Sequence, residues 1–342
     1  MTALSRRHLL AGASALAATT ISSRALAQET ATPAASPVAR GLETDGSWVF
    51  TDDRGVTIHT DALPTKIIAQ TTSAAALWDF GITPIGIFGP SRSADGTPDI
   101  QAGDLDLDAV EILGDYGAYD LEKAISLGAD LYIDVDRGGG LWYVDAELEK
   151  TLLTQFPTLA ITAANVPVTT TIAHFESLAG ALGADLDAPE IADAKSAWAT
   201  AEAEFKALLA AKPGLKILGA SPGEAEVYVL NPPVLGDLSY YVSLGADFIV
   251  PENPTASTLF NFEMMSWEQF GKYASQADLI LLDRRSDTTF LDDVEIWNTF
   301  PAVQAGQVGT WYGVFSFSYK GLGDTLNLMI EQVTAADPGI VS

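Results

Sequence analysis

The sequence has no cysteine among its 342 residues and only three histidines. Without thiols the chain forms no disulfide bond, no thiolate metal site and no lipid-modified cysteine. His59 and His174 are the only histidines beyond residue 27, and they are far apart in the sequence. We therefore do not expect a histidine cluster that captures zinc or manganese directly.

Basic residues are also few, with 18 Lys and Arg against 45 Asp and Glu, so the formal net charge is −27. A surface this acidic repels nucleic-acid phosphates and anionic lipid headgroups. We therefore expect no nucleic-acid partner. The acid excess fits a solvated surface better than a calcium site, because no D-x-D-x-D-G loop is present; DLDLDAVE at 104–111 comes nearest to one.

Beyond the N-terminus, no apolar run reaches the length of a transmembrane helix. Residues 1–27 read as an export signal, with SRRHLLAG at 5–12 and a small-x-small ALA tripeptide at 25–27. The twin arginine favours the twin-arginine route, and an ordinary secretory signal is the alternative. Residues 28–41, rich in Thr, Ala, Pro and Ser, are predicted to be a disordered linker. We expect a periplasmic or extracytoplasmic protein, free after cleavage or tethered by an uncleaved signal.

Apolar periodicity alternates between strand-like and helix-like segments along the chain. An alternating hairpin at 48–60 precedes a buried strand at 66–69, a helix at 73–81 and a strand at 82–89. This compact β-α-β spacing is typical of a parallel sheet. The first part of the chain is therefore predicted to form an α/β lobe.

The same pattern restarts after two helical segments. Residues 168–183 carry one apolar helical face, and Asp187 is predicted to be the N-cap of a second long helix at 188–211. A strand–helix–strand pattern then resumes at residue 215. The predicted organisation is an α/β N-terminal lobe at 42–167, a helical connector at 168–183 and an α/β C-terminal lobe at 184–342.

A helix–strand–arginine phrase occurs once in each predicted lobe. DLEKAISLGADLYIDVDR ends at Arg137, and SWEQFGKYASQADLILLDRR ends at Arg284 and Arg285. Open α/β sheets bind ligands at the carboxyl ends of their strands, and sites between domains are common. We therefore expect these arginines to face a shared cleft. One of the pair in the second lobe is expected to form an ion pair with Asp283 or Asp287, which leaves a single functional arginine there.

Five segments, in order, resemble the periplasmic substrate-binding proteins that serve ABC importers of iron–siderophore complexes, cobalamin and haem. The segments are TDDRGVTIHTDALPTKI, PTKIIAQTTSAAALWDFGITPIGIFG, DLEKAISLGADLYI, SWEQFGKYASQADLILLD and PAVQAGQVGTWY. The resemblance implies two Rossmann-like lobes with parallel-rich sheets, joined by one long connector helix that 168–183 matches best. It also implies a shallow interlobe cleft, limited hinge motion, no catalysis and delivery of cargo to a membrane permease.

A cleft for a ferric siderophore needs aromatic walls and cationic donors, because such cargo is bulky, polar around the iron and often anionic. The candidate ligand-binding residues are Tyr116, Tyr119, Arg137, Trp142 and Tyr143 in the first lobe, and Tyr228, Asn231, Arg284, Arg285, Trp311 and Tyr319 in the second. Packing and surface ion pairs are the alternative roles for these side chains. Tyr228 and Asn231 lie in EVYVLNPP, which we expect to be a loop at a strand exit. The alternation of aromatic residues over 311–319 predicts an extended segment that turns half of them towards the core.

In the resembling family an exposed acid on each lobe meets arginines of the permease. Glu122 matches the first-lobe position, and a solvated acid stabilised by the helix dipole is the alternative role. The second lobe has no glutamate at the matching place, and Asp237 and Asp247 are the nearest acids. We therefore take Glu122 and Asp247 as candidate docking residues.

The sequence predicts a monomeric binding protein for a ferric siderophore, with haem or cobalamin as alternative cargo. No intrinsic cofactor is expected, and iron would enter only as part of the cargo. A secreted hydrolase or a surface sensor is less well supported, since no G-x-S-x-G elbow, phosphate-binding loop or dinucleotide fingerprint is present. The sequence does not distinguish between the siderophore classes.

Overall fold

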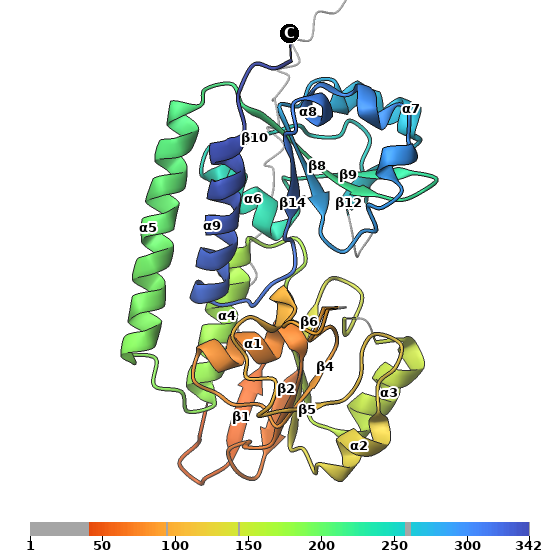
Figure 1. Ribbon diagram of the computed structural model, residues 1–342. Helices are drawn as coiled ribbons and strands as arrows, with labels where there is room; N and C mark the ends of the chain where they lie inside the picture. The colour runs from red at the N-terminus through yellow and green to blue at the C-terminus, as the bar shows by residue number, and fades with distance from the viewer. Residues whose placement is uncertain (1–40, 94, 143, 257–260, 342) are drawn as a thin grey trace, which may run out of the picture. The chain divides into compact units, whose positions relative to one another are not determined.

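The structure, a computed structural model, describes residues 41–93, 95–142, 144–256 and 261–341. The predicted export signal, nearly all of the predicted linker and the candidate residue Tyr143 lie outside these described residues. The described residues form mainly helices and two large parallel-rich sheets (Figure 1). This confirms the predicted α/β class. In the described part of the chain, no helix combines the length and apolarity that a membrane span requires.

Five parallel strands form the first sheet, in the order β5-β4-β3-β6-β7. The central strands are buried on both faces, as expected of a parallel sheet that helices cover. The strands are β3 (Ile67–Gln70), β4 (Gly86–Phe88), β5 (Glu111–Ile112), β6 (Leu131–Asp136) and β7 (Thr158–Thr162), and the helices between them are α1 (Thr71–Asp79), η1 (Ile100–Ala102), α2 (Leu121–Ser126) and α3 (Ala146–Gln155).

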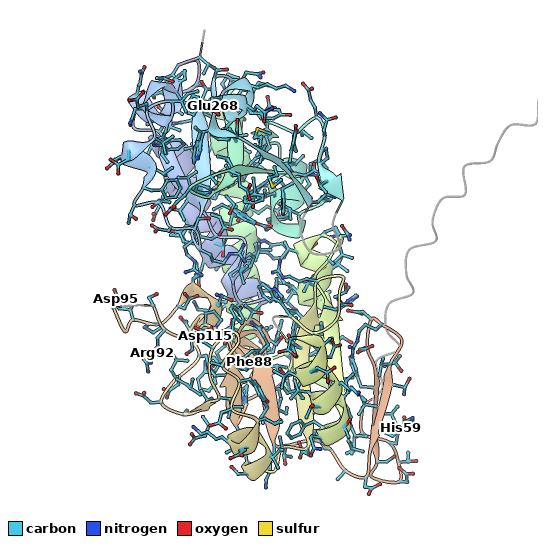
Figure 2. The ribbon with its side chains drawn as sticks, turned by 90° about the vertical axis from the view of Figure 1, so that its right-hand side faces the viewer. His59, Phe88, Arg92, Asp95, Asp115 and Glu268 are labelled. Carbon is cyan, nitrogen blue, oxygen red and sulfur yellow. The ribbon has the colours of Figure 1, made fainter. Side chains whose placement is uncertain are left out.

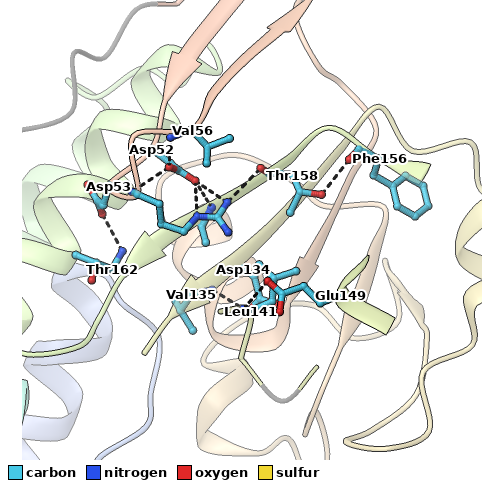
Figure 3. A network of polar contacts seen from close by, with 12 residues as sticks. Asp52, Asp53, Val56, Asp134, Val135, Leu141, Glu149, Phe156, Thr158 and Thr162 are labelled. Carbon is cyan, nitrogen blue, oxygen red and sulfur yellow. Dashed lines mark hydrogen bonds and ion pairs between the residues drawn. The ribbon is translucent and has the colours of Figure 1, made fainter. Parts of the chain in front are cut away.

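A hairpin of β1 (Trp48–Thr51) and β2 (Thr57–Thr60) closes the open edge of this sheet at β7. Its turn places two carboxylates against the edge strand (Figure 3): Asp52 accepts from the Ala160 N–H at 3.0 Å and Asp53 from the Thr162 N–H at 2.8 Å. The guanidinium of Arg54 neutralises Asp52 at 2.7 Å. Edge donors left unpaired would cost free energy and invite other strands to pair, so the D-D-R turn protects the edge.

The second sheet has the order β11-β12-β9-β8-β13-β14, with β10 also paired to β8. Its parallel strands are β8 (Lys216–Pro222), β10 (Asp247–Phe248), β13 (Leu279–Asp283) and β14 (Val308–Trp311). Its antiparallel strands are β9 (Val227–Leu230), β11 (Thr255–Ala256) and β12 (Asn261–Met265). Around them lie α7 (Trp267–Ala274), η2 (Leu291–Asp293), η3 (Trp297–Thr299) and α8 (Pro301–Gln304).

The antiparallel strands correct one prediction from the sequence. EVYVLNPP was expected to be a loop, but Val227–Leu230 forms β9 between β8 and β12. The strand exists because it pairs with both neighbours, and this pairing is not visible in a short apolar run that ends in Asn-Pro-Pro. As a result Tyr228 lies on a strand and not on a loop.

Three long helices pack beside the sheets. We call the first sheet with its helices, residues 41–167, the first block, and the second sheet with its helices, residues 184–341, the second block. Helix α4 (Val168–Ala181) contacts α1 and β7 of the first block and α6 (Gly236–Ser243) of the second. Helices α5 (Pro189–Ala211) and α9 (Tyr319–Ala335) run side by side (Figure 1, green and dark blue). Glu176 of α4 accepts hydrogen bonds from Lys195 of α5 at 2.6 Å and from the Tyr319 hydroxyl of α9 at 2.7 Å. The three helices are therefore tied together by one carboxylate.

Two further local predictions were wrong. The N-cap of α5 is Ala188, which makes no side-chain hydrogen bond, and not Asp187; Pro189 at the start of the helix has no N–H to be capped. The segment after Trp311 is a loop and not a strand, so its alternation has no structural meaning. Phe315 and Phe317 are both buried, because the loop folds between α4 and the first block.

The hairpin turn provides the first test. Replacing Asp52 by Ala removes the carboxylate that pairs with Arg54 and leaves its guanidinium only the Thr158 carbonyl oxygen at 3.4 Å, and it leaves the Ala160 N–H without its acceptor. We expect Asp52→Ala to lower the free energy of unfolding in urea by about 3 kcal/mol. The exposed Asp61, replaced by Ala in the same way, should change it by less than about 0.5 kcal/mol. Equal losses in the two variants would contradict a role of the turn in closing the edge.

Candidate ligand-binding site

A cavity of about 380 Å³ opens at the carboxyl ends of β8, β13 and β14 in the second block. This is the edge at which open α/β sheets bind ligands. Its volume falls within the range of small-molecule sites. It is lined by Ser221, Tyr228, Leu230, Phe262, Asp283, Arg285, Ser286 and Trp311.

Arg285 is held in this cavity by the carboxylate next to it. Its Nε and Nη2 donate to Asp283 at 3.0 and 2.7 Å, and its backbone N–H donates to the same carboxylate at 3.0 Å. The guanidinium carbon lies 5.8 Å from the centre of the Trp311 ring, close enough for a cation–π contact. Pairing of one of the two arginines with Asp283 is thus as predicted, and it fixes the orientation of the guanidinium. The expectation that pairing leaves the other arginine for the ligand is not met, because the paired Arg285 lines the cavity and Arg284 pairs with Asp99.

Trp311 is fixed by a second buried acid. Its Nε1–H donates to the carboxylate of Asp237 in the first turn of α6. Burial raises the pKa of Asp237, while the hydrogen bond from Trp311 and the nearby charge of Arg137 act in the opposite direction. Asp237 is buried and holds a cleft residue, so it is not an exposed docking acid.

Tyr228 and Phe262 form an aromatic corner on the antiparallel strands. Their rings meet edge to face with centres 4.8 Å apart, and the Tyr228 hydroxyl donates to Glu226. That hydrogen bond raises the pKa of Tyr228. Asn231 lies just beyond the end of β9, where its Nδ2 donates to the Asn261 side chain at 3.0 Å; it is buried and does not line the cavity.

In the first block, Arg137 and Trp142 form a stacked pair after β6. The guanidinium carbon lies 4.1 Å from the centre of the Trp142 ring and 5.8 Å from that of Phe317 in the second block. Trp142 is buried, and the half-buried Tyr116 lies 6.3 Å from it between ring centres, with its hydroxyl donating to Gln101 at 3.1 Å. The structure therefore groups Tyr116, Arg137 and Trp142.

Tyr119 faces the interior of the first block and is not part of this group. Its ring packs on Phe88 and on Tyr132, with centres 4.8 and 6.4 Å away. Burial, together with the charge of Asp134, raises the pKa of its hydroxyl well above the ordinary value. Asp134, labelled in Figure 3, is itself fully buried, and burial raises the pKa of its carboxyl. These contacts give Tyr119 a packing role.

Two more predicted residues lie outside the cavity. Tyr319 begins α9, where its ring packs 5.6 Å from Trp198 and its hydroxyl bonds Glu176. Arg284 forms a two-pronged ion pair with Asp99 of the first block, at 2.9 and 3.0 Å. Both side chains are thus engaged by the protein itself.

Sequence reasoning missed several residues of the cavity. Ser221 and Ser286, whose hydroxyls are 2.9 Å apart, sit at the ends of β8 and β13, so the strand-end rule that selected the arginines would also have found them. Phe262 gave no such signal, because its strand was not predicted. Asp99 lies 185 residues from Arg284, and nothing in the sequence links the two.

The candidate docking acids and the histidines lie apart from the cavity. Glu122 is exposed in the first turn of α2, and Asp247 on β10 pairs with Lys216 at 2.6 Å. His59 lies on the hairpin of the first block (Figure 2), and His174 bonds Asp53 at 2.9 Å. In the described ranges, no group of three or more His, Asp or Glu side chains is arranged to hold a metal ion.

Comparison with known proteins gives a consistent result. The chain matches no family model and no curated protein. Among solved structures, it is similar to DesE, a ferric-siderophore receptor protein from Streptomyces coelicolor, with 37% identity and a TM-score of 0.77, over 85% of this chain and 99% of that one.

More distant structures share the fold. The siderophore periplasmic binding protein from the fuscachelin gene cluster of Thermobifida fusca has 18% identity and a TM-score of 0.56, over 79% of this chain and 96% of its own. The siderophore-binding protein FhuD from Vibrio cholerae, bound to Fe³⁺–Desferal, has 16% identity and a TM-score of 0.58, over 80% and 99%. With DesE matched over nearly its whole length, the chain belongs to the family of class III periplasmic substrate-binding proteins.

Proposed function

We propose that this protein captures a ferric-siderophore complex between its two blocks and delivers it to an ABC importer. The observation that carries the proposal is the cavity at the strand ends of the second sheet, where an oriented arginine lies beside an aromatic wall. Similarity to a ferric-siderophore receptor over almost the full length of that receptor supports the same cargo. No step of this function requires catalysis or a resident cofactor.

The side chains of the cavity suit such a cargo. Trp311, Tyr228 and Phe262 offer rigid aromatic area to the organic shell. Arg285, oriented by Asp283, is a donor for the charged oxygens that surround the iron. The second arginine, Arg137, lies over Trp142 in the first block. The cavity supplies contact area and one cation, and Arg137 of the first block would supply a second cation to a cargo held between the blocks.

Haem and cobalamin remain alternative cargoes, since the aromatic wall would also contact a macrocycle. The ion pair of Arg285 with Asp283 limits the net positive charge of the cavity. A complex recognised there is held by directed hydrogen bonds and ring contacts more than by long-range attraction. This favours a compact ferric complex over a flat macrocycle.

We further propose that the protein acts outside the cytoplasm as a monomer, exported by the signal at 1–27. Glu122 is the favoured contact with the permease, because it is exposed and forms no ion pair with the residues that the structure describes. Asp247 is the weaker candidate, since Lys216 already engages its carboxylate.

Cargo is identified by titrating residues 28–342 with ferric hydroxamate and catecholate siderophores, haem and cobalamin while tryptophan fluorescence is followed. We expect saturable quenching by one ferric class at micromolar concentration or below, because Trp311 lines the cavity. Trp311→Phe should reduce the amplitude of that quenching. Tight binding of haem or cobalamin with no response to any ferric siderophore would replace the proposed cargo.

The electrostatic role of the arginines is tested by combining Arg137→Ala with Arg285→Ala. Loss of Arg285 leaves the charge of Asp283 facing the cargo, so affinity for an anionic ferric complex should fall about tenfold more than affinity for a neutral one. Isothermal titration calorimetry measures both affinities. Arg92→Ala, at an exposed arginine paired with Asp108 in the first block, is the matched control. Equal losses for both complexes would remove the electrostatic role.

Docking is tested by charge reversal at Glu122. Glu122→Arg should lower cargo uptake through the importer by repelling the permease arginines, whereas Glu147→Arg, at the equally exposed first turn of α3, should not. Uptake of labelled cargo into vesicles that contain the importer gives the measurement. Equal uptake by the two variants would exclude Glu122 as the contact.

A further inference from the structure

The two blocks are joined by a partly buried ion pair between Asp99 and Arg284. Arg284 directly follows β13, and its Nη1 and Nη2 contact Oδ2 and Oδ1 of Asp99 at 2.9 and 3.0 Å. The side chain of Asp99 is 8% exposed and that of Arg284 is 24% exposed. A two-pronged arginine–carboxylate contact fixes orientation as well as distance. This pair therefore sets the relative position of the two strand edges that carry the candidate ligand residues.

Each partner of the pair is also connected to the cleft in its own block. The Arg284 backbone N–H donates to the Trp311 carbonyl oxygen at 3.2 Å, and Arg285 is the next residue. On the other side, Asp99 caps η1 by accepting from the Gln101 N–H at 2.9 Å, and the Gln101 side chain accepts from Tyr116 at 3.1 Å. The ion pair thus links the aromatic group of the first block to the cavity of the second.

The other polar contacts between the blocks do not combine two charged partners with burial. The carboxylate of Asp79 in α1 accepts from Ser316 at 2.8 Å and from Ser318, and Lys320 pairs with Asp104 at 2.9 Å. The lysine pair is exposed, and exposed pairs contribute about 0–1 kcal/mol. Loss of one partner from a buried pair is far more costly, because it strands the other charge. Of the two ion pairs that join the blocks in the described ranges, Asp99–Arg284 is the more buried.

We propose that Asp99 and Arg284 form an interlobe latch that sets the width of the cleft and slows release of the cargo. Arg284 is then a positioning residue, engaged by a protein carboxylate and acting through Trp311 and Arg285. Only the effect on cargo rests on the proposed function; the latch itself is a property of the cargo-free protein. Without the latch, the blocks would be held by α4, by the contacts of Asp79 and Lys320 and by ring packing of Phe80 on Tyr319, and they would sample wider separations.

Two substitutions separate the latch from a direct contact of Arg284 with cargo. Asp99→Asn keeps an amide oxygen for the Gln101 N–H but removes the charge that holds Arg284. Arg284→Gln removes the guanidinium and leaves the cap of η1 intact. A latch is lost in either variant, so both should behave alike and the double variant should add little. A direct cargo contact would be lost in Arg284→Gln alone.

The first measurement needs no cargo. The natural chain has no cysteine, so Lys150→Cys on α3 and Glu268→Cys on α7 introduce two unique, exposed positions for spin labels; Figure 2 shows Glu268. Electron–electron double resonance then gives the distribution of distances between the blocks in the full mature protein. We expect a wider distribution in Asp99→Asn and in Arg284→Gln than in the parent. In Arg284→Lys, which keeps the charge, the distribution should be narrower than in those two variants but wider than in the parent. Arg92→Gln, which breaks an ion pair within the first block, should match the parent.

The second measurement is the dissociation rate of the Fe³⁺–Desferal complex in stopped flow. We expect it to rise about fivefold or more in both latch variants, since coupling of this kind is commonly worth that factor. Parent-like distance distributions in both variants, each shown to be folded by circular dichroism, would overturn the latch. Faster release from Arg284→Gln alone would also overturn it and assign Arg284 to the cargo. Absence of Desferal binding in the parent would count against this cargo and leave the distance result to decide on the latch.

Discussion

Pairing of three partly buried arginines, Arg54, Arg284 and Arg285, with carboxylates is the constraint on which the rest of this structure depends. An unpaired charge in a protein interior costs several kcal/mol, and a carboxylate beside the guanidinium offsets that cost. Arg54 with Asp52 closes the edge of the first sheet, Arg285 with Asp283 forms one side of the cavity, and Arg284 with Asp99 joins the two blocks. In a chain with 45 acids and 18 bases, acids are abundant enough for all three.

The same pairing explains why the cleft can be ready for its cargo before the cargo arrives. Arg285 is oriented by three hydrogen bonds to one carboxylate, and Trp311 by its bond to Asp237. Side chains fixed in this way lose little rotamer entropy when a ligand binds. A binding protein that must later release its cargo gains selectivity from such order without needing extreme affinity.

Much of the fold was predictable from local signals. The β-α-β spacing from residue 66, the helices beside it and the repeated helix–strand–arginine phrase all depend on residues close together in the sequence. The antiparallel part of the second sheet was not predictable, because β9 and β12 owe their strand character to pairing with each other and with β8. The prediction that 311–319 is an extended segment was wrong for a related reason. The aromatic residues of this segment pack against α4 and the first block, and not along a sheet.

The candidate site shows the same difference between what local sequence predicts and what depends on distant parts of the chain. Strand-end position selected Arg137, Arg285 and Trp311, which the structure places at the cavity or facing the other block. It also selected Arg284 and Tyr319, whose partners Asp99 and Glu176 come from distant parts of the chain. Sequence position indicates which edge a side chain occupies, but the partner that engages it depends on how the two blocks meet.

The most direct test of the account is a crystal structure of the mature protein with a bound ferric siderophore. We expect the iron-bound oxygens within hydrogen-bonding distance of the Arg285 guanidinium, the organic shell against Trp311, and the Asp99–Arg284 ion pair intact. Cargo bound away from the cavity, or Arg284 detached from Asp99 and turned to the cargo, would contradict it.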